Sequence, residues 1–354
     1  VNGYHFLMLE PTTYSATAGC PYKKEAVEWL DNMLKKLTAE NPEQYVFVCT
    51  HPMIYNTCYG SDLDGNPSYW STTYLTPTLS KYSQVVTFGG HLHFPINDNR
   101  SIMQGAFTSL GCGSVRYMAI EAGGYENMAG ATTMNDRYEI SSGLLIQVDE
   151  NGNVKVTKMF FSEDTPFEEP WTIAHPDAEG THLKKYSRET REAANKAPTL
   201  GNVKIDPREN TKTGVKTYLT FDAAIDDEFA HHYEIEIKHI TAGKVINKKI
   251  LSDFYHHAKR SDMKKSYELF LGNLKDGKYK VTLTAYDSWG AASDTFVYEW
   301  ESAKGEVTEK KATLYADFDF SGGTVKDTLG RIEVTNMGAT VENATVIHGG
   351  KAYT

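Results

Sequence analysis

The sequence predicts an α/β layered domain followed by an all-β sandwich. Two observations support this prediction. Apolar strand-like runs alternate with helical patterns over the first ninety residues, and short alternating strands with turn signals fill the stretch from about 199 to 302. A chain of 354 residues is long enough for two or three domains. The expected parts are an α/β domain over 1–170, a linker over 171–198, the sandwich over 199–302, and a hinge with the start of another β-rich domain over 303–354.

The elements of the first domain follow from hydrophobic periodicity. In the stretch 23–37, apolar residues recur every three or four positions, which predicts an amphipathic helix. Continuous apolar runs that include 45–49 and 85–88 predict buried strands of a parallel sheet. The remaining expected elements are a strand over 4–9, a short helix over 73–82, sheet over 101–109, and a hairpin over 143–161 with its turn at 149–153.

The second half of the chain has a different pattern. Strand-like runs such as 216–221, 233–237 and 279–286 alternate apolar and polar residues, as expected of an immunoglobulin-like sandwich. The string from Leu274 to Gly290 resembles the end of a fibronectin type III module, in which Tyr279 would occupy the tyrosine corner. The run 312–320 resembles the opening of a laminin-G-type, lectin-like jelly roll.

Composition restricts the possible binding partners of the chain. The chain carries 46 acidic against 36 basic residues, a net charge of −10, which disfavours non-specific binding to nucleic acid or to an anionic membrane. No stretch approaches the roughly 20 apolar residues that a membrane span requires. The sequence begins at Val1 in what resembles mid-domain sequence, so we expect a fragment or a processed piece. The spacing of Cys20, Cys58 and Cys112 leaves a disulfide among them open.

Three histidines follow directly on two of the predicted strands. His51 comes after the first strand, within Thr-His-Pro, and His91 and His93 come after the second, within Gly-Gly-His-Leu-His. The carboxyl ends of parallel strands collect ligand and metal chemistry, and adjacent strands lie roughly 4.8 Å apart. The two glycines allow a sharp turn. We therefore expect the three imidazoles to face one cleft and to bind metal.

These motifs carry a family resemblance. Thr50-His51-Pro52, Gly90-His91-Leu92-His93 and the run 108–114 are similar to the last motifs of calcineurin-like metallophosphoesterases, over about residues 1–170. The resemblance implies a hydrolase of phosphate esters with two divalent ions (manganese, iron or zinc) that flank a bridging hydroxide. His51 and His91 would bind one ion, and His93 the other. The substrate would be a small phosphate ester or a nucleotide.

The chain departs from that family in one respect. The upstream motifs Asp-x-His, Gly-Asp-x-x-Asp and Gly-Asn-His-Asp/Glu do not occur in it. Three histidines without a carboxylate do not hold two ions in the usual geometry, so we expect this chain alone to bind one ion weakly or none and to be inactive, with no catalytic residue of its own assigned. One alternative is that Asp62, Asp64 or Asp98 replaces the missing ligands.

Several residues outside the histidine motifs have more than one possible role. Tyr55 and Asn56, between the histidine motifs, could stack on and bind a substrate's nucleoside or sugar group; core packing is the alternative. The histidine pairs at 231–232 and 256–257 are expected at solvated surface or edge positions.

The chain as a whole also has two interpretations. It could instead be an adhesion protein whose β modules bind a glycan or a cell-surface protein, with the phosphoesterase part as scaffold. The modular layout favours a bacterial protein that is secreted or attached to the cell envelope.

Overall fold

The computed structural model describes residues 2–63 and 68–305 and, beyond these, the short stretches 318–319, 324–327, 340–342, 345–348 and 351–353. The chain forms two compact units, 1–304 and 305–354. In the second unit, β19 (Phe318–Asp319) pairs with β20 (Lys326–Asp327), and β22 (Thr345–His348) pairs with β21 (Thr340–Glu342) and β23 (Lys351–Tyr353). Most of the predicted jelly-roll opening at 312–320 lies outside the described residues.

A five-stranded sheet forms the centre of the N-terminal region. Its order is β1-β2-β5-β7-β6, with parallel pairing from β1 to β7 and an antiparallel β6 at the edge. The strands are β1 (His5–Leu9), β2 (Val46–Thr50), β5 (Val85–Gly89), β6 (Ile102–Gln104) and β7 (Thr108–Gly111). The central strands β2 and β5 are almost wholly buried, which explains their continuous apolar runs.

Helix α1 (Lys24–Glu40) covers one face of this sheet. Leu30, Leu34 and Leu37 recur at helical spacing and pack with the apolar side chains of β2 and β5. The predicted helix over 73–82 is shorter in the structure, since α2 spans only Thr76–Leu79. The long loop before it contains the two-residue strands β3 (Met53–Ile54) and β4 (Ser71–Thr72), which pair in parallel.

A second sheet contains the predicted hairpin, β8 (Ser142–Val148) and β9 (Val154–Phe160). Strand β9 also pairs with β10 (Thr165–Pro166) and β11 (Trp171–Ile173). The segment expected to be a linker, 171–198, therefore begins with a sheet strand, and it also contains the helix α3 (Arg188–Ala194). Trp171 is buried because β11 packs against the first domain's core.

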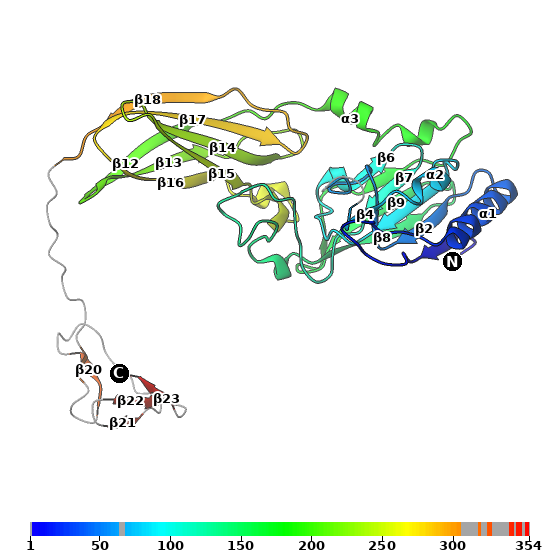
Figure 1. Cartoon of the computed structure of the whole chain (residues 1–354), viewed down its shortest axis with the longest axis horizontal. Helices are drawn as coiled ribbons and strands as arrows, with labels where there is room; N and C mark the ends of the chain where they lie inside the picture. The colour runs from blue at the N-terminus through cyan, green and yellow to red at the C-terminus, as the bar shows by residue number, and fades with distance from the viewer. Residues whose placement is uncertain are drawn as a thin grey trace. The chain divides into compact units, whose positions relative to one another are not determined.

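The C-terminal part of the first unit is a β-sandwich (Figure 1). One sheet contains β12 (Val203–Thr211), β13 (Gly214–Asp222) and β16 (Ser266–Leu274). The other contains β14 (Ala230–His239), β15 (Lys244–Leu251), β17 (Gly277–Asp287) and β18 (Phe296–Ser302). Alternating residues such as Ile235, Leu271 and Leu283 fill the core. The predicted sandwich is confirmed at this level, and the described chain is mainly β-sheet with few helices. Among the described residues, no helix is long and apolar enough to cross a membrane.

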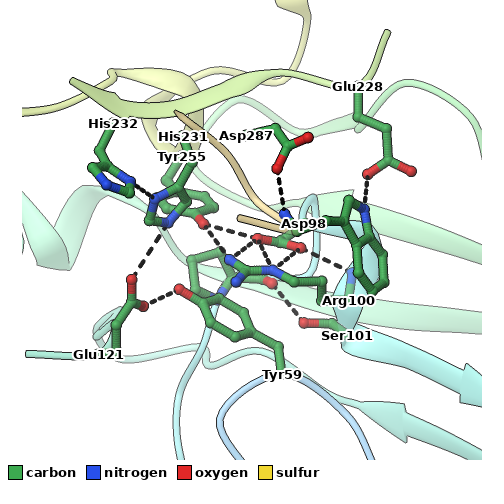
Figure 2. A network of polar contacts seen from close by, with 12 residues as sticks. Tyr59, Asp98, Arg100, Ser101, Glu121, Glu228, His231, His232, Tyr255 and Asp287 are labelled. Atoms are coloured by element: carbon green, nitrogen blue, oxygen red, sulfur yellow. Dashed lines mark hydrogen bonds and ion pairs between the residues drawn. The ribbon is translucent and has the colours of Figure 1, made fainter. Parts of the chain in front are cut away.

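A buried ion pair joins the N-terminal region to the sandwich (Figure 2). Asp98 is fully buried, and its carboxylate accepts a 2.7 Å hydrogen bond from Arg100 Nη2 and a 2.8 Å bond from the hydroxyl of Tyr255. Tyr255 belongs to the sandwich half of the chain, whereas Asp98 and Arg100 precede β6. The neighbouring Phe254 and Ala258 complete one continuous apolar core across the junction.

The network continues on the other side of Arg100. The guanidinium lies 3.7 Å from the centre of the Tyr59 ring, and the Tyr59 hydroxyl donates to Glu121. Glu121 Oε1 lies 3.5 Å from Nε2 of His231, which is 3% exposed. The expectation of a solvated or edge position is therefore wrong for His231, because the junction with the first domain covers the start of β14.

We expect Asp98→Ala to lower the free energy of unfolding by about 3–5 kcal/mol, because it leaves the Arg100 guanidinium buried without its carboxylate partner. Chemical denaturation of the purified chain would measure this loss. Asp62 is exposed and provides the control, since Asp62→Ala should change stability by no more than about 0.5 kcal/mol. Equal effects of the two variants would contradict a buried, paired Asp98.

The buried histidines at the junction predict a loss of stability in acid. Burial lowers the pKa of His231 to about 3 and that of His232 to about 4, from an ordinary value of 6.5. At a pH between the ordinary pKa of 6.5 and these lowered pKa values, the unfolded chain binds protons on the two histidines that the folded chain does not. The free energy of unfolding should therefore fall as the pH falls from about 6.5 to about 4. Urea titrations at several pH values would give the free energy of unfolding at each pH. This free energy should fall less steeply with decreasing pH in His231→Gln than in the wild type, and an equal pH dependence would refute the buried, neutral His231.

Candidate metal centre

Parallel pairing of β2 with β5 brings the histidine motifs together. His51 follows the last residue of β2, and His91 follows Gly90 at the end of β5. The backbone carbonyl of His51 accepts hydrogen bonds from the backbone N–H groups of Gly90 and His91, both 3.0 Å long. This double contact fixes the two loops against each other at the carboxyl edge of the sheet, as the strand pattern predicted.

The two imidazoles meet directly. Nε2 of His51 lies 2.9 Å from Nδ1 of His91. Two nitrogen ligands at right angles on one ion, each about 2.1 Å from it, lie about 3 Å apart. The same separation suits a hydrogen bond between the neutral rings, so the pair can form without metal and needs little rearrangement to bind it.

His93 lies beside this pair in a constrained backbone. Its φ of 60° is in the left-handed region, and its ring packs at 4.4 Å against Tyr117. Nδ1 of His93 and Nε2 of His91 are both buried without a hydrogen-bond partner among the described residues. Unpaired buried ring nitrogens are costly, and these two are distinct from the nitrogens of the contact between His51 Nε2 and His91 Nδ1.

The electrostatics keep these rings neutral. Burial, with His51 and His93 nearby, lowers the pKa of His91 to about 4. Burial also lowers the pKa of His93, and His51 and Arg116 add to the effect. A metal ligand must be a neutral imidazole, so at neutral pH no proton has to leave His91 or His93 before an ion binds.

Aromatic side chains enclose His91. Tyr14, Tyr69 and Trp70 lie with ring centres 5.0, 4.9 and 5.2 Å from it. Tyr69 and Trp70 belong to the long loop between the two histidine motifs. Tyr14 lies far away in the sequence, in an irregular loop without a distinctive motif, so no sequence signal pointed to it.

The residues present suit one ion better than two. Within residues 2–63 and 68–305, no group of three or more His, Cys, Asp or Glu side chains is arranged as a ligand set. Asp98 faces Arg100 and Tyr255 at the junction, so its oxygens are already engaged. Asp64 lies outside the described residues. The pair His51 and His91 can hold a single ion, whereas a dinuclear centre does not fit these side chains alone.

The two predicted substrate residues lie elsewhere. Tyr55 and Asn56 line a pocket of about 450 Å³ with Thr73 and Phe107, and none of the three histidines lines it. The structure therefore brings His51, His91 and His93 together and separates Tyr55 and Asn56 from them.

A wide groove of about 810 Å³ runs beside the histidines instead. His51 and His93 line it, together with the free cysteines Cys49 and Cys112. Its remaining walls are largely apolar side chains from both sheets, among them Phe6, Met8, Phe88, Val115, Leu144 and Phe161.

Comparisons with known proteins leave the family open. No family model and no curated protein matches the chain. Among solved structures, the FN5 domain of Drosophila Lar is 14% identical and covers 31% of this chain and 99% of its own, with a TM-score of 0.21. Chitinase ChiA74 from Bacillus thuringiensis is 12% identical and covers 85% of this chain and 59% of its own, with a TM-score of 0.21. Both scores are too low to support an argument about fold or site.

The apolar groove predicts self-association. Met8 and Val115 are 75% and 76% exposed, and contiguous apolar surface of this kind favours contact with another apolar surface. Sedimentation velocity should show concentration-dependent association of the wild-type chain and loss of it in Met8→Lys/Val115→Lys. Val297→Lys, at a 51% exposed site on the sandwich, should leave association unchanged. A wild-type chain that is monomeric at all concentrations would contradict this prediction.

Proposed function

We propose that this chain contributes the imidazole ligands of a metal-dependent hydrolase of phosphate esters. The contact between His51 Nε2 and His91 Nδ1, at the ends of two adjacent parallel strands, is the observation that supports the proposal most directly. The resemblance of Thr-His-Pro and Gly-His-Leu-His to calcineurin-like metallophosphoesterases supports the choice of reaction, and the sandwich would then be a fibronectin type III-like accessory module.

Each of the three histidines has a distinct part in this proposal. His51 and His91 would hold one divalent ion, because their facing nitrogens have the separation of neighbouring ligands. When bound, such an ion polarises a phosphate oxygen and lowers the pKa of a bound water. His93 lines the adjacent groove, where it can donate a hydrogen bond to a phosphate group. The rings of Tyr14, Tyr69 and Trp70 pack around His91 and would help to hold its orientation.

The proposal also limits what the chain does by itself. A second ion needs oxygen ligands, and the carboxylate motifs of the calcineurin-like family do not occur in this sequence. We therefore propose that these residues alone bind about one ion and hydrolyse phosphate esters slowly or not at all, and that full activity depends on carboxylates from another polypeptide segment.

Metal content measured by plasma mass spectrometry tests the proposal. After incubation with manganese or zinc and gel filtration, we expect the wild-type chain to retain up to one equivalent and His51→Ala/His91→Ala to lose it. His5→Ala is the matched control, because His5 is an exposed histidine on β1 and should leave the metal content unchanged.

The same samples should be assayed with bis-p-nitrophenyl phosphate. Metal that is lost in the double variant, with little turnover in the wild type, would support the proposal. Equal metal in all three proteins would refute the ligand assignment and favour the adhesion module instead. Rapid turnover would show that the chain holds further ligands and would overturn the proposed dependence on added carboxylates.

A further inference from the structure

A second pocket lies at the junction between the N-terminal region and the sandwich. It has a volume of about 350 Å³, and both parts of the chain line it. Asn97, Asn99 and Lys158 come from the N-terminal region, and Glu228 and Arg260 come from the sandwich half. None of its lining residues lines the groove beside the histidines. Pockets of this size at domain junctions are typical small-molecule sites.

Lys158 is the most unusual residue of this pocket. It occupies a position on β9 that alternation directs to the interior, between the buried Val156 and Phe160, and it is only 3% exposed. Its ammonium lies 4.8 Å from the centre of the Trp171 ring, but it has no carboxylate within ion-pair distance and no hydrogen bond to any described residue. Lys158 lines the pocket, so a ligand there could supply the hydrogen-bond acceptor that no described residue supplies to the ammonium. Burial accordingly lowers the pKa of Lys158 to about 8.

Asn97 has a buried hydrogen-bond acceptor without a donor. The side chain is 7% exposed, and its Nδ2 donates to the backbone carbonyl of Phe254 at 3.3 Å. That carbonyl can only accept, so the amide orientation is fixed and Oδ1 points elsewhere. Oδ1 is buried and has no donor among the described residues. Lys158 and Asn97 both line the pocket, so the Lys158 ammonium and Asn97 Oδ1 are its candidate donor and acceptor.

The charges around the pocket narrow the choice of ligand. Its lining contains Lys158, Arg260 and a histidine, His257, which contacts Asp253 at 2.9 Å, against four acidic side chains, Glu168, Glu169, Asp227 and Glu228. Arg260 is already paired with Glu168 at 3.1 Å. An anion would meet an excess of carboxylates, and a simple cation would meet Lys158. A neutral ligand whose groups both donate and accept avoids both penalties.

We propose that this junction pocket binds a small neutral polyhydroxylated molecule, a sugar of one or two rings, through Lys158 and Asn97. A hydroxyl group accepts from the Lys158 ammonium while another donates to Asn97 Oδ1. Glu228 and Asn99 offer further polar atoms along the wall, and Phe167 and Phe254 provide apolar contact. This site is independent of the proposed metal centre.

Binding of neutral monosaccharides to the full chain tests the proposal. Glucose, galactose, mannose and N-acetylglucosamine would be compared with glycine, serine, citrate and inorganic phosphate by calorimetry. We expect at least one sugar to bind, and Lys158→Met to weaken it about ten-fold or more, as the loss of a charged hydrogen bond predicts. Lys155→Met is the control, because Lys155 is exposed on the same strand.

A second measurement uses only the wild-type chain, in case Lys158→Met does not fold. Reductive methylation with ¹³C-formaldehyde labels the lysine amines, and the binding sugar should slow labelling of Lys158 but not of Lys155. Three outcomes would overturn the proposal: no sugar binds, a sugar binds Lys158→Met as tightly as the wild type, or only the charged compounds protect Lys158.

Discussion

The burial of Asp98 is the constraint on which the arrangement of the first unit depends. A carboxylate removed from water must be paired and hydrogen-bonded. Arg100 supplies the charge from two residues along the chain, but Tyr255 supplies its hydroxyl from the sandwich half. The N-terminal region therefore satisfies this charge completely only when the sandwich is docked. The shared apolar core around Phe254 adds the area-dependent part of the stabilisation.

One loop connects this constraint to both candidate sites. It leaves β5 with His91 and His93, passes through the fully buried Ile96, and reaches Asn97 and Asp98. Because Asp98 is fixed at its far end, the loop has little freedom at its start, where His93 adopts a left-handed backbone. The histidine pair and the junction pocket thus share one rigid connection, although the ligands proposed for them differ chemically.

Much of the site could be predicted from the sequence, because strand ends are local features. The apolar runs ending before His51 and Gly90 fix both histidine motifs to one sheet edge whenever the strands pair in parallel. The hairpin around Gly152 follows from its turn residues in the same way. The placement of Tyr55 and Asn56 could not be predicted, because the path of a long loop depends on tertiary contacts. His231 was misplaced because the partner surface that buries it lies more than a hundred residues away, around Glu121.

The environment of Lys158 could not be predicted from the strand pattern. In the hairpin pattern it occupies an inward position, where a lysine commonly indicates an edge or a snorkelling side chain. The structure instead places it at the wall of the junction pocket, with its charge near Asp98 and Glu228 but paired with neither. Burying an apolar residue at this position would cost less free energy than burying a lysine, because an apolar side chain needs no hydrogen-bond partner. A ligand that supplies a hydrogen-bond acceptor to the Lys158 ammonium would lower this cost, as the proposed sugar site requires.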